Sequence, residues 1–134
     1  MSEAQWTEIA ALDLSTARAA IKAFAAALGA PEEPVPATFA FTVFSHPSVM
    51  ETLARLAAER SAVLVHQAQD FVYHGTLEAD RHYTVLVDWK PHEGRPDRLT
   101  LRGRVQPLQG EIADTPLQDF RAEIVLFENR EEAP

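Results

Sequence analysis

The sequence predicts an α+β fold in which helices come first and an antiparallel sheet follows. Apolar residues recur at helical spacing in two segments before Arg60, and several later segments alternate between apolar and polar residues. Alternation with a period of two is typical of antiparallel strands that bury one face. We therefore expect a sheet folded over the helix near residues 47–60, which lies next to the strands in the chain.

The first predicted helix begins after Ser15 or Thr16, because either side chain can cap it. Its apolar positions are spaced by three and four residues: Ile21, Phe24 and Leu28. Gly29 is expected to end this helix, and Pro31 follows it. We expect residues 6–14, which precede this helix, to form a short strand.

The second predicted helix covers residues 47–60, because Pro47 suits the first turn of a helix. Ser48 and Glu51 have the spacing of a capping box. The apolar side of this helix is expected to contain Met50, Leu53, Leu56 and Ala57. The aromatic segment 38–44, between the two helices, is expected to be extended or irregular.

Four strands are predicted after the second helix, over residues 63–74, 83–89, 99–105 and 120–126. The chain turns through residues 75–80, so we expect the first two of these strands to form a hairpin. Polar side chains on the first strand make it a candidate part of a functional site.

Length and composition are those of an ordinary globular chain. With 134 residues, 46% of them hydrophobic and 24% charged, we expect one domain over residues 1–134. Its last residues, 128–134, form a short acidic end. There is no cysteine, which excludes disulfides, thiolate chemistry and cysteine-built metal centres.

The charge balance argues against a nucleic-acid partner, since 12 Lys and Arg face 20 Asp and Glu and the net charge is −8. No apolar stretch approaches the roughly 20 residues that span a bilayer, and the chain does not begin with a leader-like segment. No glycine-rich phosphate-binding loop is present. We therefore expect a cytoplasmic protein with no membrane partner and no cofactor.

The segment after the second helix carries a recognisable pattern. Its residues follow the form H-G-x-Q-x-F-x-Y-H-x-P-L at His66, Gln69, Phe71, Tyr73, His74 and Leu77. Upstream, AIKAFAAALG is followed by PVPATFAF. The order of these segments resembles the hot-dog fold, and more narrowly the N-terminal domain of MaoC-like dehydratases and hydratases. The resemblance covers residues 6–127, with departures at Gln67, Thr76 and the Asp80–Arg81 pair.

The resemblance implies that one catalytic motif is missing. Catalytic halves of that family carry G-D-x-N-P-x-H after the early helix, and its aspartate and histidine activate the water added across an enoyl-thioester. Here Gly29 is followed by APEEP, so the aspartate position is Ala30, and no histidine precedes His46. Alanine cannot exchange a proton. The chain therefore resembles a noncatalytic half that shapes the acyl-binding tunnel.

The same resemblance implies the partners. They are an acyl-CoA or acyl-carrier thioester, and a second hot-dog chain in a homodimer or in a heterodimer with a catalytic subunit. Two alternatives stay open. One is a self-sufficient hot-dog homodimer, a hydratase or thioesterase, that uses other residues such as His66 or Asp70. The other is a binding or regulatory module without catalysis.

The histidines of the first long strand do not predict a metal site. His66, Asp70 and His74 are expected to share one face of the strand, because all three positions are even, but successive members lie about 13 Å apart at about 3.3 Å per residue. One ion bound at about 2 Å from each ligand cannot reach them. A site between His74 and His82 across the hairpin is geometrically possible, but exposed or hydrogen-bonded histidines are the simpler interpretation.

His66 and Gln69 are the better candidates for ligand binding, because a buried polar group without a partner costs about 1–3 kcal/mol. They either line the thioester pocket or form hydrogen bonds with the backbone or across a dimer seam. His66 with Asp70 is the weaker hypothesis of a catalytic pair. Thr38 and Phe39 are either core residues or residues that border the substrate tunnel.

Positive charge gathers between residues 90 and 104 of this acidic chain. Arg102 and Arg104 could hold the phosphates of coenzyme A. The alternative is a solvated strand face beside a charged loop. The other basic residues of the span are Lys90, Arg95 and Arg98.

Overall fold

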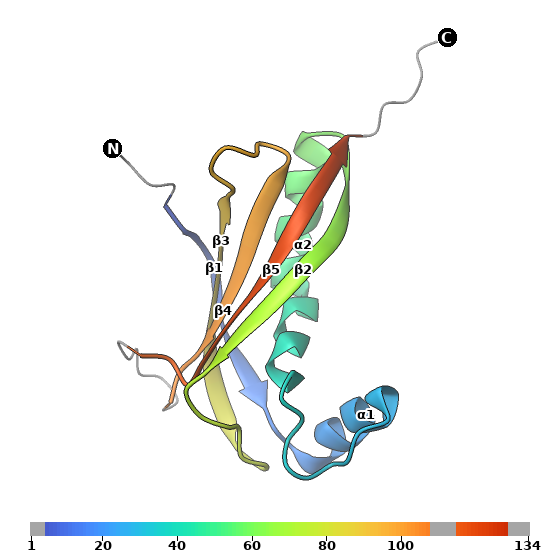
Figure 1. Ribbon diagram of the computed structural model, residues 1–134, viewed down its shortest axis with the longest axis vertical. Helices are drawn as coiled ribbons and strands as arrows, with labels where there is room; N and C mark the ends of the chain where they lie inside the picture. Colours follow the sequence, from blue (N-terminus) through green and yellow to red (C-terminus); the bar gives the residue numbers. More distant parts are fainter. Residues whose placement is uncertain (1–4, 108–114, 129–134) are drawn as a thin grey trace.

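The computed structural model describes residues 5–107 and 115–128, which contain five strands and three helices (Figure 1). The elements follow in the order β1 (Thr7–Ser15), α1 (Arg18–Leu28), the 3-10 helix η1 (Phe39–Ser45), α2 (Pro47–Glu59), β2 (Ala62–Tyr73), β3 (His82–Pro91), β4 (Arg98–Val105) and β5 (Gln118–Glu128). This is the predicted α+β organisation, with the leading strand present as β1. Beyond Glu128, the expected acidic end lies outside the described residues.

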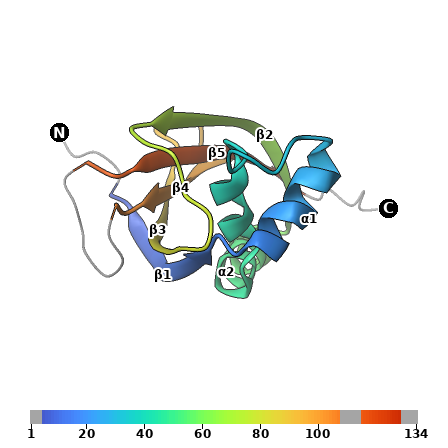
Figure 2. The ribbon, with the colours of Figure 1, turned by 90° about the horizontal axis from the view of Figure 1, so that it is seen from below.

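The five strands form one antiparallel sheet in the order β1-β3-β4-β5-β2. The sheet curls round α2, and α1 lies at the open side of the curl (Figure 2). The side of the sheet that faces the helices carries the core, in which Val85, Leu101 and Phe120 are almost fully buried. The predicted sheet folded over the helix near 47–60 is therefore confirmed.

The hairpin predicted between β2 and β3 is wrong. β2 pairs with β5, whereas β3 pairs with β1 and β4, so two strands separate β2 from β3 in the sheet. The segment 75–80 is a crossing between different parts of the sheet. The metal site considered between His74 and His82 required this hairpin, so its structural basis is absent.

Helix α2 begins at Pro47 as predicted, but its N-cap differs from the expected one. The N-cap residue is His46, whose Nδ1 accepts a hydrogen bond from the backbone N–H of Ser48 at 3.1 Å. Ser48 is already the second helical residue, so the capping box with Glu51 does not form.

The buried side of α2 consists of Val49 and Leu53. Met50, which was expected on the apolar side, is 53% exposed. One residue corresponds to about 100° of rotation in an α-helix, so Met50 lies well round the helix from Val49. Part of α2 therefore faces away from the sheet.

The expected side-chain cap of α1 is also absent, because the N-cap is Ala17 and makes no side-chain hydrogen bond. Thr16 is instead fully buried. Its hydroxyl donates to the carbonyl of Glu78 at 2.6 Å and accepts from the N–H of Arg81 at 2.9 Å. Thr16 thus ties the start of α1 to the segment 75–81. Gly29 ends α1 in the left-handed conformation, as predicted.

The aromatic segment expected to be extended or irregular forms η1 instead. Its Phe44 ring lies 4.9 Å from the ring of Phe120 on β5, measured between centroids. The hydroxyl of Thr42 donates to the carbonyl of Phe39 at 2.8 Å. The aromatic residues therefore attach η1 to the sheet. In the part of the chain that is described, no helix is long and apolar enough to cross a membrane.

Candidate functional site

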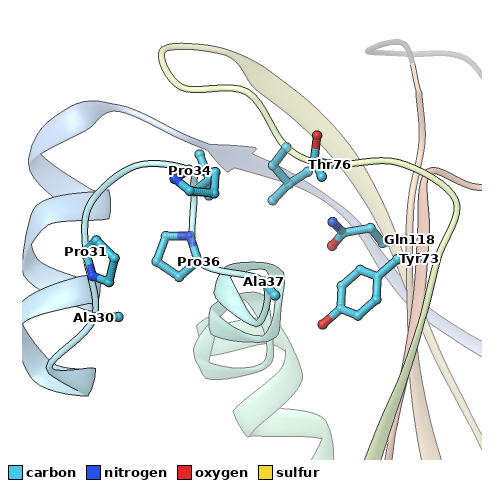
Figure 3. Close-up of a pocket in the computed structure, with 10 residues that line it drawn as sticks. Ala30, Pro31, Pro34, Pro36, Ala37, Tyr73, Thr76 and Gln118 are labelled. Atoms are coloured by element: carbon cyan, nitrogen blue, oxygen red, sulfur yellow. The ribbon is translucent and has the colours of Figure 1, made fainter.

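A pocket of about 280 Å³ lies between the connection from α1 to η1 and the end of β2 (Figure 3). Its walls are mainly apolar, formed by three prolines, two alanines, Val35 and Leu77. Three polar side chains complete the lining: Tyr73, Thr76 and Gln118. None of these described lining residues is charged. The pocket therefore suits an uncharged, mainly aliphatic group, oriented by a few polar atoms.

Tyr73 on β2 and Gln118 on β5 are register partners, so their side chains project on the same face of the sheet. Both reach toward the segment that carries Pro36 and Ala37 (Figure 3). Tyr73 is 45% exposed, yet desolvation by its neighbours raises the pKa of its phenol above the ordinary value. The phenol is therefore neutral at physiological pH and can both donate and accept hydrogen bonds.

The amide of Gln118 is only half satisfied. Gln118 is 3% exposed, and its Nε2 donates to the carbonyl of Gly75 at 3.2 Å. No described residue donates to its Oε1, although this oxygen is buried. A buried acceptor without a partner is uncommon in folded proteins and calls for an explanation.

The connection from α1 to η1 brings no acid–base group to the pocket. Ala30 and Val35 both line it, at the positions where the resemblance described above would place the aspartate and the histidine of G-D-x-N-P-x-H. Glu32 and Glu33 line a neighbouring hollow instead. There Glu33 forms an ion pair with Arg18 at 3.3 Å, and this hydrogen bond raises the pKa of the guanidinium.

A β-bulge interrupts β2 in the middle of its polar stretch. His66 pairs with Ile124, and the next pair along the strands is Ala68 with Glu123. Gln67 is therefore the extra residue, which has no counterpart on β5. Residues on the two sides of the bulge follow opposite alternation.

The bulge changes which polar residues share a face. His66 and Gln69 are register partners of core residues of β5 and so face the helices. Asp70 is the partner of Arg121 and faces the other side of the sheet. The expectation that His66, Asp70 and His74 share one face is therefore wrong. The hypothetical catalytic pair of His66 and Asp70 is separated by the sheet itself.

His66 lies on the exposed part of β2, where its ring stacks on Phe41 with centroids 5.4 Å apart. Its Nε2 lies 3.1 Å from the carbonyl oxygen of Ala68. Phe41 also approaches Phe71, whose ring stacks on Tyr73 at 5.5 Å. An aromatic surface therefore leads along β2 from His66 to the pocket.

Thr38 and Phe39 lie close to the pocket in sequence, but neither lines it. Phe39 is 3% exposed and packs edge-on against Phe24, with centroids 5.3 Å apart. Thr38 is half-buried at the start of η1. Their proposed role in ligand binding stays a prediction, and the packing of Phe39 favours the core interpretation.

Arg102 and Arg104 lie on the face of the sheet opposite to His66. Arg102 forms two hydrogen bonds to the buried carboxylate of Asp88, at 2.6 and 2.8 Å, and Arg104 approaches the same carboxylate at 3.4 Å. The Arg102 guanidinium also lies 3.8 Å from the ring centroid of Trp6. Phosphate binding by these arginines stays a prediction, and any phosphate would compete with Asp88.

Gln118 was not among the site residues predicted from the sequence. A signal was present, because the buried residues of β5 fall at even positions, as Phe120, Ala122 and Ile124 do. Residue 118 continues this series and is polar. A glutamine in the apolar phase of a strand is a candidate for a buried hydrogen-bonding group.

Taken together, the order of elements and the curled sheet around α2 define a hot-dog fold. No protein-family profile matches the chain, and no curated protein matches its sequence significantly. The likeness to solved structures is one of fold, at low sequence identity.

Three solved structures illustrate this likeness. A probable thioesterase from Bartonella henselae superposes with a TM-score of 0.56 and 12% identity, over 94% of this chain and 96% of that one. The HadBC complex, a 3R-hydroxyacyl-ACP dehydratase from Mycobacterium tuberculosis, superposes with a TM-score of 0.54 and 12% identity, over 91% of this chain and 96% of that one. The R-hydratase PhaJ1 from Pseudomonas aeruginosa superposes with a TM-score of 0.50 and 20% identity, over 100% of this chain and 90% of that one.

Proposed function

We propose that the protein is a noncatalytic accessory half of an enoyl-thioester hydratase or dehydratase. It would bind the acyl part of the thioester and stabilise a catalytic hot-dog partner. The observation that carries the proposal is that Ala30 and Val35 line the pocket at the two motif positions where a hydratase needs an aspartate and a histidine. General acid–base catalysis needs a proton-exchanging group within hydrogen-bond reach of the substrate, and neither side chain supplies one.

The character of the pocket supports an acyl ligand. Its lining is uncharged and mainly aliphatic, and it continues into the aromatic surface between Tyr73 and His66. An acyl chain buries apolar area there and gains about 0.8 kcal/mol per methylene group. The proposed ligand is therefore an acyl-CoA or an acyl-carrier thioester.

The edge of β2 supports a partner chain. β2 lies at the end of the described sheet, and its edge has no strand beside it. Four of its apolar side chains are strongly exposed: Val63, Val65, Val72 and Tyr73. A long apolar edge strand favours pairing with another chain. β1, the other edge, has no large apolar side chain exposed to this extent. The proposed partner therefore adds its sheet along β2.

Two binding measurements test the proposal. Isothermal titration of the purified chain with hexanoyl-CoA and with free coenzyme A is expected to show that the acyl chain increases affinity. Co-expression with a hot-dog subunit that carries the Asp/His motif is expected to yield a complex at equal stoichiometry. The absence of acyl-dependent binding, both alone and in that complex, would contradict the proposed function.

A further inference from the structure

We propose that Oε1 of Gln118 accepts a hydrogen bond from an N–H or O–H group on the uncharged chain of the thioester. Gln118 is then a specificity-determining residue of the pocket. This assignment rests on the proposed function, because it names the part of an acyl thioester that the pocket recognises. Its two possible sources are a hydroxyl group on the acyl chain and an amide N–H of the pantetheine arm.

The orientation of the Gln118 amide follows from its surroundings. Nε2 lies 3.2 Å from the carbonyl oxygen of Gly75 and donates to it. The reverse orientation would place two acceptor oxygens at that distance. Oε1 is therefore the free end of the amide, and it carries a lone pair that no described residue uses.

The surroundings restrict the chemistry of the missing donor. The described lining contains no charged side chain, so an ammonium or guanidinium group would lose its hydration without a counter-charge. A neutral donor on an aliphatic chain avoids this cost. The pocket volume of about 280 Å³ lies near the lower end of the range for ligand pockets, about 300–1,000 Å³, which is enough for a short chain segment.

Tyr73 lies beside Gln118 in the pocket lining (Figure 3). Its side chain is the cross-strand neighbour of Gln118, and it lies on the free edge strand with 45% of its surface exposed. Oε1 itself is shielded from solvent. Because Gln118 itself lines the pocket, a ligand bound there lies beside its amide.

The test compares hexanoyl-CoA, 3R-hydroxyhexanoyl-CoA and pantetheine as ligands of the full chain. Gln118→Met keeps the volume of the side chain and removes the acceptor. We expect this substitution to lower the affinity for the donor-bearing ligand about tenfold, because one hydrogen bond in a buried site is then not made. Gln106→Met is the matched control, because Gln106 is 1% exposed and does not line the pocket.

The three ligands separate the two sources. If Gln118 accepts from the hydroxyl group of the acyl chain, 3R-hydroxyhexanoyl-CoA binds to the wild type more tightly than hexanoyl-CoA does. Gln118→Met then removes this difference in affinity. If Gln118 accepts from the pantetheine amide, Gln118→Met binds both acyl-CoAs and pantetheine more weakly, by a similar factor. Unchanged binding of all three in Gln118→Met overturns the assignment while leaving the proposed function intact. No binding of any acyl thioester to the wild-type chain overturns both.

A measurement on the wild-type protein covers the case in which Gln118→Met does not fold. The side-chain amide resonances of Gln118 are followed by nitrogen-15 NMR during titration with each ligand. A change in these resonances that exceeds the change at Gln106 supports the assignment. Saturation with ligand without such a change overturns it.

Discussion

Thr16 shows how one hydroxyl group holds together parts of the chain that are far apart in sequence. It is fully buried, and its hydroxyl links the carbonyl of Glu78 to the N–H of Arg81. The segment held in this way includes Leu77, which forms part of the pocket wall. A threonine before a helix suggests a cap, and only the tertiary structure shows that its partners lie more than 60 residues away.

Thr16→Val is expected to lower the free energy of unfolding by about 1–3 kcal/mol, because both backbone groups lose their buried partner. Urea denaturation measures this change. Thr7→Val at an exposed position of β1 is the control and should stay within about 0.5 kcal/mol of the wild type. An equally small effect at Thr16 would show that its hydrogen bonds contribute little.

Gly103 is required by the close approach of an aromatic ring. A Cβ at this position of β4 would overlap the ring of Phe120, which is fully buried. Gly103→Ala is therefore expected to cost about 1–3 kcal/mol through overpacking. The melting curve of the same substitution in a Phe120→Leu background tests the cause, since the penalty should shrink there. An undiminished penalty would place the cause elsewhere.

Single residues of the site were predictable only in part. The sequence identifies His66 and Gln69 as polar residues in a strand, and both do face the helices. It cannot reveal the bulge at Gln67, because a bulge is defined by the partner strand and leaves no local signature here. Asp70 was misplaced for that reason.

At the scale of elements, strands and helices were predicted better than their pairing. Alternation located β3, β4 and β5, and Pro47 located the start of α2. The position of β2 beside β5 depends on contacts across the whole sheet. Such long-range pairing is not encoded in the turn at 75–80, which therefore suggested a hairpin.

The exposed edge of β2 leads to a prediction about assembly. Val65→Lys places a charge on an apolar side chain that is 41% exposed. If Val65 is buried by a partner, losing that burial costs about 1.5 kcal/mol or more, which is at least about tenfold in the dissociation constant. Sedimentation velocity measures the assembly of the chain with itself or with a motif-bearing subunit.

The control for this assembly experiment is Met50→Lys. Met50 is 53% exposed but lies on α2, away from the edge of β2. It should leave assembly unchanged. If both substitutions weakened assembly equally, the interface would include α2. If neither weakened it, the proposal that the partner pairs with β2 would be wrong.

At the scale of the whole molecule, the fold and the apolar lining of the pocket favour different conclusions about function. The hot-dog fold is shared with solved proteins named as a thioesterase, a dehydratase and a hydratase. The fold alone does not determine chemistry, which depends on the groups in the site. Ala30 and Val35 line the pocket with apolar side chains that cannot exchange a proton. The proposed binding role beside a catalytic partner would reconcile the two observations.

The decisive measurement is the turnover of crotonyl-CoA by the purified chain, both alone and mixed with a hot-dog subunit that carries the Asp/His motif. We predict no hydration and no thioester hydrolysis by the chain alone, and hydration by the mixture that exceeds the activity of the subunit alone. Turnover by the chain alone that is abolished in His66→Ala or in Asp70→Asn would contradict the account and identify a self-sufficient enzyme.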